Sequence, residues 1–182
     1  MSRLPIYVVP HPMLKKTADP VKKFGDETRQ LLDNMLETMY HAHGIGLAAP
    51  QVGALQRVIV VDVEQPEGGG RGKPLFIVNP EIIKTSAEIN VYQEGCLSVP
   101  GQYADVERPR DVRIGYLDYD GNPQEVETGG LLATCIQHEI DHLNGILFID
   151  HVSSLKRDML LRKVKKWSKD IDDETKADYV IP

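Results

Sequence analysis

The sequence predicts an α+β fold, in which a mainly antiparallel sheet surrounds a central helix and a further helix lies near each end of the chain. Three observations predict it. Apolar residues recur at helical spacing near both ends, short apolar runs bounded by turn residues fill the middle, and His138 and His142 share one face of a helical stretch. With 182 residues, 41% of them hydrophobic, the chain can bury one substantial core, so we expect a single domain over residues 1–182.

The first helix is predicted between Asp26 and His41, where apolar side chains recur every three or four residues and Gly44 follows as a suitable stop. Apolar runs of strand length follow at residues 58–63, 75–78 and 82–92. The glycines of residues 66–74 predict a flexible loop between the first two runs.

A hairpin is predicted next, because the turn residues Asp120-Gly121-Asn122 separate two apolar runs at 112–119 and 124–128. Gly129-Gly130 then precedes the central helix, which we place at residues 131–143.

The C-terminal segment concentrates charge. Residues 156–169 contain seven basic side chains and one acidic, a local charge of +6 in a chain of net charge −6. An apolar stripe of helical period runs through this stretch, so we predict an amphipathic helix packed on the body of the protein. The simpler interpretation of its basic face is contact with water. The acidic tail is residues 170–182, and its part from Asp170 to Asp178 is expected to be disordered.

The central helix predicts a metal site. His138 and His142 are four residues apart and can reach one ion, with Glu139 beside them. From His138 the sequence matches the His-Glu-x-x-His-x-x-Gly-x-x-His pattern of a protease family, except that Phe148 stands where the last histidine belongs. Cys135 lies seven residues from His142, about 10.5 Å at 1.5 Å per residue, too far to share one ion.

The remaining soft donor is Cys96. Asp150 and His151 follow the central helix, but their spacing is that of a polar helix boundary and does not single them out as ligands. A thiolate with two imidazoles would leave a fourth position open to water, which is the arrangement of a catalytic metal site.

Three motifs in order resemble the peptide deformylase family. They are GIGLAAPQ from Gly44 to Gln51, EGCLS from Glu94 to Ser98 and QHEIDHLNG from Gln137 to Gly145. The resemblance extends from about Val9 to Leu155, most of the chain. It implies an enzyme that removes the formyl group from the initiator methionine of newly made proteins and releases formate, with N-formylmethionyl nascent polypeptides as its partners.

The expected chemistry is metal-assisted hydrolysis of a formamide. Glu139 would take a proton from the attacking water and return it to the leaving amine. The backbone amide of Leu97 and the side chain of Gln51 would donate to the oxyanion. The ligands Cys96, His138 and His142 suit several divalent ions. The resemblance implies Fe(2+) in the cell, with Zn(2+), Ni(2+) or Co(2+) as alternatives.

Substrate contacts are expected from small and apolar residues of the three motifs and their neighbours. The resemblance implies that the contacting residues are Gly44, Ile45, Gly46, Tyr92, Glu94, Leu131, Thr134 and Cys135. Glu94 and Asp141 also fit a second role, either orienting the histidine rings or pairing with Arg108 or Arg110. Where some relatives have an arginine near the substrate backbone, this chain has Gly101-Gln102-Tyr103.

Other features set the expected context. The start of the chain lacks a signal-peptide pattern, no apolar run reaches about 18 residues, and two cysteines do not suggest a disulfide framework, so we expect a cytoplasmic protein. We also expect a monomer. Two alternatives remain: a metallopeptidase that cuts internal peptide bonds, and an inactive relative that binds ribosomes. The family resemblance also makes ribosomal RNA a possible partner of the basic helix at 156–169.

Overall fold

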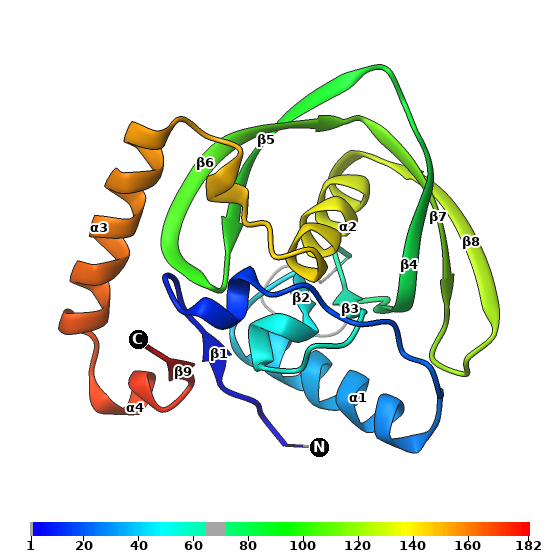
Figure 1. The fold of residues 1–182 in the computed structure, drawn as a ribbon, viewed down its shortest axis with the longest axis horizontal. Coiled ribbons are helices and arrows are strands. Elements are labelled where there is room, and N and C mark those ends of the chain that lie inside the picture. Colours follow the sequence, from blue (N-terminus) through cyan, green and yellow to red (C-terminus); the bar gives the residue numbers. More distant parts are fainter. Residues whose placement is uncertain (1, 65–71) are drawn as a thin grey trace.

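Helices lie near both ends of the chain and strands fill its middle, so the predicted α+β class is confirmed (Figure 1). The computed structural model describes residues 2–64 and 72–182. The α-helices are α1 (Asp26–His41), α2 (Gly130–Leu143), α3 (Ser154–Asp170) and α4 (Asp173–Lys176). Short 3-10 helices are η1 (Pro12–Lys15), η2 (Ala49–Val52) and η3 (Phe148–Asp150).

The strands of the described residues form three sheets, which are mostly antiparallel. They are β1 (Ile6–Tyr7), β2 (Gly46–Ala48), β3 (Val58–Val61), β4 (Leu75–Thr85), β5 (Ile89–Cys96), β6 (Val99–Pro109), β7 (Asp111–Leu117), β8 (Pro123–Gly129) and β9 (Tyr179–Val180). The main sheet has the order β2-β3-β4-β7-β8, while β5 pairs with β6 and β1 with β9. The predicted β7–β8 hairpin is present, closed by a hydrogen bond from the Gly121 amide to the Asp118 carbonyl.

The predicted division between strands at 75–78 and 82–92 is wrong. The structure has one strand, β4, through residues 75–85, and the chain turns only before β5. Asn79-Pro80 interrupts the apolar run, and Asn79 has a positive φ of 51°. The β4–β7 pairing absorbs this irregularity as a register shift between Val78 and Glu81 and then continues. The predicted loop at 66–74 falls largely outside the described residues.

Helix α2 occupies the centre of the molecule, where the main sheet and the β5–β6 hairpin surround it (Figure 1). Every residue from Ala133 to Ile140 is buried. The apolar side chains Ile136, Ile140 and Leu143 pack in one cluster with the sheet. Polar residues are uncommon in a helix that is buried on all sides, so His138, Glu139 and His142 are candidates for a functional role.

Strand β3 separates two layers of core, because alternate side chains of a strand point to opposite faces. Ile59 and Val61 belong to the cluster that contains α2, whereas Val58 and Val60 pack in the cluster of α1. Helix α3 packs on β6 in a third cluster, to which it contributes Leu160 and Val164. Strand β3 is therefore packed on both faces, against α2 on one and α1 on the other.

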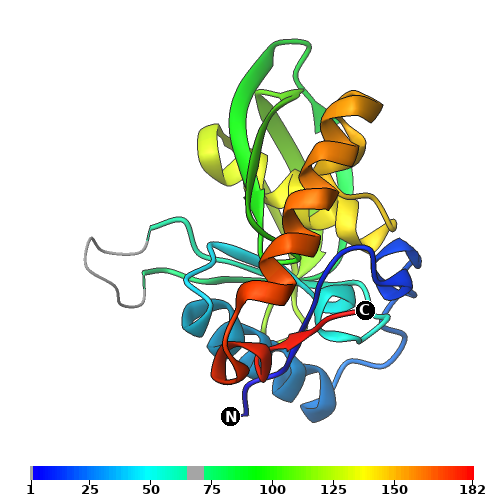
Figure 2. The same ribbon diagram turned by 90° about the vertical axis from the view of Figure 1, so that its left-hand side faces the viewer.

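The expectation that residues 170–178 are disordered is wrong. The segment turns through α4 and adds β9 alongside β1 in parallel, with Ile6 opposite Tyr179 and Tyr7 opposite Val180 (Figures 1 and 2). The Tyr179 ring also packs edge-on against Trp167, with centroids 5.2 Å apart. The apolar Tyr179-Val180-Ile181 run at the end of an acidic segment is the signal that composition alone obscured.

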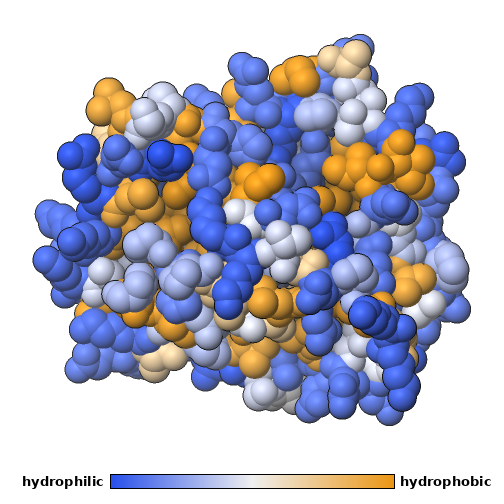
Figure 3. Space-filling model, in the orientation of Figure 1, coloured by the Kyte–Doolittle hydropathy of each residue, from blue (hydrophilic) through white to orange (hydrophobic). Residues whose placement is uncertain are grey.

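The surface is mixed. Figure 3 shows apolar side chains beside α3 and over the strands on the opposite side of the same face, with polar residues between them. Among the described helices, none has the length and apolar character that a bilayer crossing requires.

Candidate metal centre

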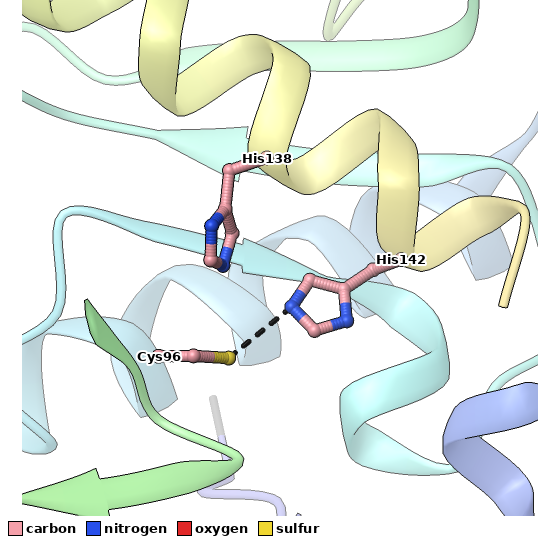
Figure 4. Close-up of side chains that lie close together, drawn as sticks. All are labelled: Cys96, His138 and His142. Atoms are coloured by element: carbon pink, nitrogen blue, oxygen red, sulfur yellow. Dashed lines mark hydrogen bonds between the residues drawn. The ribbon is translucent and has the colours of Figure 1, made fainter. Parts of the chain in front are cut away.

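The two histidines of α2 project from successive turns toward the same space (Figure 4). Their ring centroids lie 5.1 Å apart in an edge-on arrangement. His138 is 7% exposed and His142 is 1% exposed, so both imidazoles are removed from bulk water. The four-residue spacing has thus placed two nitrogen donors side by side in the protein interior.

Cys96 approaches them from a different element, the end of β5 (Figure 4). Its Sγ lies 3.2 Å from Nε2 of His142. One donor atom from each of Cys96, His138 and His142 lies within 4.8 Å of the other two. The β5–β6 register shifts between Gly95 and Cys96, and this irregularity lies where the strand meets the helix.

The pKa values of the two histidines shift in opposite directions. Burial disfavours the charged form of His138, but hydrogen bonds to Cys96 and Glu94 outweigh burial and raise its pKa well above the usual value. Burial and the charge on His138 lower the pKa of His142 well below the usual value, which keeps its ring neutral and able to bind metal. A half-buried cysteine sulfur and two imidazoles are a donor set that zinc and ferrous ions accept.

Glu139 lies beside these residues and is 3% exposed. Burial raises the pKa of its carboxyl to about 7, where a carboxylate can both accept and donate a proton near neutral pH. Among the described residues its Oε2 has no hydrogen-bond partner. A buried polar atom of this kind is rare and is typical of a group that acts on a ligand.

Gln51 is held beside the sulfur by its own network. Its Oε1 accepts a hydrogen bond of 2.8 Å from the Ala48 amide, and its Nε2 donates to Ser98 Oγ at 3.1 Å and to Cys96 Sγ at 3.4 Å. The amide side chain is therefore fixed with its donor end toward the cluster. Leu97 follows Cys96 in the turn between β5 and β6 and lines the same cavity.

A buried network of charged side chains holds the His138 ring through its Nδ1 atom. Its Nδ1 donates to Glu94 Oε2 at 2.8 Å, and Arg108 donates to the same carboxylate through Nε at 2.5 Å and Nη2 at 3.0 Å. Arg108 Nη1 also donates to Asp141 at 2.8 Å, as does His151 Nε2. Burial of Glu94 opposes its ionisation, but these hydrogen bonds hold its pKa at about 2. Both alternatives for Glu94, ring orientation and pairing with Arg108, are therefore realised together.

A cavity of about 610 Å³ opens beside the cluster. Its lining contains all eight residues that the sequence predicted for substrate contact, together with Gln51, Leu97, Cys96, His138 and Glu139. Ligands of drug size occupy pockets of roughly 300–1,000 Å³. The lining also contains Trp167, Thr175 and Tyr179, which the sequence analysis did not single out and which lie outside the three motifs.

The α+β fold and the three convergent donor atoms are those expected of a metal-dependent hydrolase. The family model for polypeptide deformylase matches residues 3–158. The chain belongs to the peptide deformylase family, and it is an enzyme that removes the N-formyl group from the initiator methionine of new polypeptides in a metal-dependent reaction.

Peptide deformylases from several bacteria are similar to this chain over more than nine tenths of its length. A peptide deformylase from Rhodopseudomonas palustris strain TIE-1 is 52% identical over 169 residues, which is 93% of this chain and 97% of the relative. One from Brucella suis biovar 1 is 51% identical, covering 91% and 94% of the two chains.

Solved structures agree with this membership. The crystal structure of peptide deformylase from Ehrlichia chaffeensis superposes with a TM-score of 0.88 at 40% identity and covers 94% of this chain and 99% of that one. The structure from Legionella pneumophila gives 0.86 at 44% identity, covering 93% and 96%.

Proposed function

We propose that Cys96, His138 and His142 hold the divalent ion of this deformylase and that Glu139 moves the proton. The observation that carries this assignment is the convergence of three donor atoms within 4.8 Å, next to a buried carboxylate oxygen that has no partner among the described residues. We propose Fe(2+) as the ion in the cell. Zn(2+), Ni(2+) and Co(2+) match the same donors.

A divalent ion bound by these side chains supplies a Lewis acid for the formyl carbonyl and lowers the pKa of adjacent water. Glu139 accepts the proton of the attacking water through its unpartnered Oε2 and then delivers that proton to the leaving amine. Its burial keeps the carboxylate from being solvated by bulk water, so its basicity is used on the substrate.

The negative charge that develops on the formyl oxygen needs donors already in place. Gln51 Nε2 is oriented toward Cys96 by the hydrogen bond that Ala48 makes to the other end of its amide group. The Leu97 amide is the second donor in this proposal, because it directly follows Cys96 in the turn. Removal of one oxyanion donor costs about 10²–10³ in kcat in a serine protease.

The methionine side chain fits the apolar part of the cavity. We propose that Ile45, Leu131 and Cys135 contact it, with Tyr92 and Thr134 beside them and with Gly44 and Gly46 leaving room for the substrate backbone. A Cβ on Gly46 would lie 2.4 Å from Glu139 Oε1, so only glycine allows the carboxylate this position. Glu94 has both oxygens occupied by His138 and Arg108, so we assign it to holding His138 in place.

The exposed face of α3 supports a second partner. Lys163, Lys165, Lys166 and Lys169 are exposed while Leu160 and Val164 anchor the helix, so the basic side chains are available to an anionic surface such as ribosomal RNA. We propose that the chain acts as one domain and one monomer on nascent polypeptides, in the cytoplasm where these are made.

One assay tests the mechanism. Formate release from formyl-Met-Ala-Ser should be measured with metal content on the same sample, for the wild-type enzyme and for Glu139→Gln. We expect the variant to retain its metal and lose activity by at least about 10³-fold, within the range for loss of an essential proton-transfer group. Turnover close to wild type would remove Glu139 from this role, and cleavage of internal peptide bonds would instead favour a peptidase.

A further inference from the structure

Tyr103 on β6 is a residue that the proposed mechanism does not use. It belongs to the Gly101-Gln102-Tyr103 segment, and its side chain is 60% exposed. The ring nevertheless packs closely on the backbone of Gly95, the residue before Cys96. A Cβ at Gly95 would lie 2.5 Å from Cε1 and 2.7 Å from Cδ1 of Tyr103. The ring therefore occupies the space that a side chain at position 95 would fill.

The pairing of β5 with β6 changes at this contact. It is regular from the start of β5 to Gly95, which lies opposite Tyr103. The next residue, Cys96, pairs with Val99, so the pairing skips residues 100–102 of β6. A bulge of this kind bends the strand pair and redirects the side chains beside it. The pair of Gly95 and Tyr103 is thus the last regular one, and the cysteine follows the shift directly.

The two faces of β5 have different roles here. Alternate residues of a strand point to the same face, and Glu94 and Cys96 both contact histidines of α2. Gly95 lies between them and is covered by the Tyr103 ring. A glycine inside a strand weakens the strand because it has no side chain to pack, and an aromatic ring from the paired strand can supply the missing contact. The ring therefore acts on the backbone between two residues of the metal site.

We propose that Tyr103 is a positioning residue of the metal site: its ring, packed on Gly95, fixes the register shift and with it the place of the Cys96 sulfur. The inference rests on the proposed role of Cys96 as a metal ligand. A glycine adopts many backbone conformations that other residues avoid, so without the ring Gly95 is free to turn the next residue away from α2. The three donor atoms, now within 4.8 Å of one another, would then converge less well.

Tyr103 also lines the cavity beside the metal-binding residues, so contact with the substrate is the competing explanation for its place. The two roles differ in what they change. Loss of a substrate contact raises KM and leaves the enzyme without substrate as it was. Positioning acts on the enzyme before the substrate arrives, so metal binding in the absence of substrate separates the two.

The test titrates the metal-free enzyme with Co(2+) alone. Affinity is measured by equilibrium dialysis, and the near-ultraviolet absorption band of a thiolate bound to Co(2+) is recorded on the same samples. For Tyr103→Ala we expect the affinity to fall about 10- to 100-fold, the range for loss of a group that orients a metal ligand. Tyr103→Phe keeps the ring on Gly95 and should bind Co(2+) as tightly as the wild-type enzyme.

Val91→Ala is the matched control. Val91 lies on the same strand as Gly95, and its side chain is 59% exposed, almost the same fraction as that of Tyr103. It lies opposite Glu107, within the regular part of the β5–β6 pairing. Its replacement removes exposed apolar surface from the hairpin without touching the register shift, so the affinity for Co(2+) should not change.

Gly95→Ala tests the same contact from the other strand. The added methyl group would lie where the ring packs, so we expect a loss of Co(2+) affinity with Tyr103 still present. In the double variant of Gly95→Ala with Tyr103→Ala the methyl group has room, and the loss should be smaller than the product of the two single losses. Circular dichroism of each sample gives the folded fraction to which the affinity is referred.

Unchanged Co(2+) affinity in Tyr103→Ala, with or without a higher KM, would overturn the inference. Equal losses in Tyr103→Ala and Tyr103→Phe, or single losses that multiply in the double variant, would overturn it as well. A wild-type enzyme that binds Co(2+) without the thiolate band would instead overturn the assignment of Cys96 as a ligand, and this inference with it.

Discussion

Replacement of Arg108 tests whether the ion network behind His138 stabilises the enzyme. The Arg108 side chain is 6% exposed and the Glu94 side chain 5%, so Arg108→Met leaves a carboxylate without its main partner in the interior. Breaking a buried pair in this way costs about 3–5 kcal/mol. The pKa of Glu94, about 2 instead of 4.5, corresponds to about 3 kcal/mol at about 1.4 kcal/mol per pKa unit, and His138 and Arg108 supply this stabilisation together.

The assay is thermal and urea unfolding of the metal-free enzyme, followed by circular dichroism. In a chain of 182 residues, 1 kcal/mol shifts Tm by about 2–4 °C, so we expect Tm of Arg108→Met to fall by about 6–20 °C. Arg110→Met is the matched control. Arg110 lies two residues further along, is 47% exposed and pairs with Glu88 and Asp111, so its loss should cost no more than about 1 kcal/mol.

Two results would refute this reasoning. A Tm within about 2 °C of wild type for Arg108→Met would mean that the buried pair contributes nothing beyond an exposed one. The double variant Glu94→Gln with Arg108→Met should recover part of the stability, because it removes the uncompensated charge. Costs that simply add in the double variant would also contradict the proposed coupling.

Three further predictions follow from the site. Gly46→Ala should displace the Glu139 carboxylate and lower kcat/KM about 10²-fold with metal retained, whereas Gly25→Ala, whose added Cβ meets nothing within 4 Å, should change activity little in the same assay. Cys96→Ala should lose its metal on dialysis, measured by metal analysis; full retention would exclude Cys96 as a ligand. Because the folded pKa of Glu94 is about 2 and its ordinary value is 4.5, its contribution to stability is present above pH 4.5 and lost as pH falls toward 2. Urea unfolding at pH 7, 4 and 3 should show this loss, and Glu94→Gln should lack that part of it.

Patterns with a strong period or a spaced motif predicted structure well. Helix α1 lies at the predicted residues Asp26–His41, and α2 begins at Gly130, one residue before the prediction. The i, i+4 spacing of the histidines also predicted that both would reach one point, because helix geometry is local and fixed.

The sequence could not show features that depend on distant contacts. Strand β6 was missed because its buried and exposed residues alternate through Pro100, Gly101 and Pro109, which resemble loop residues until β5 pairs with them. The tail was missed because Tyr179 and Val180 form a strand only when β1 offers an edge. The link from Asp141 to His151 joins residues of ordinary surface type, and only the fold brings them together.

The hydrogen bonds around the metal-binding residues also fix the orientation of the His138 and His142 rings. With Nδ1 of His138 engaged by Glu94, and Nε2 of His142 facing the sulfur, neither ring has to rotate before an ion enters. Such preorganisation lowers the reorganisation that loading requires. Replacing one divalent ion by another should therefore be a local exchange at the end of β5, which leaves the rest of the fold undisturbed.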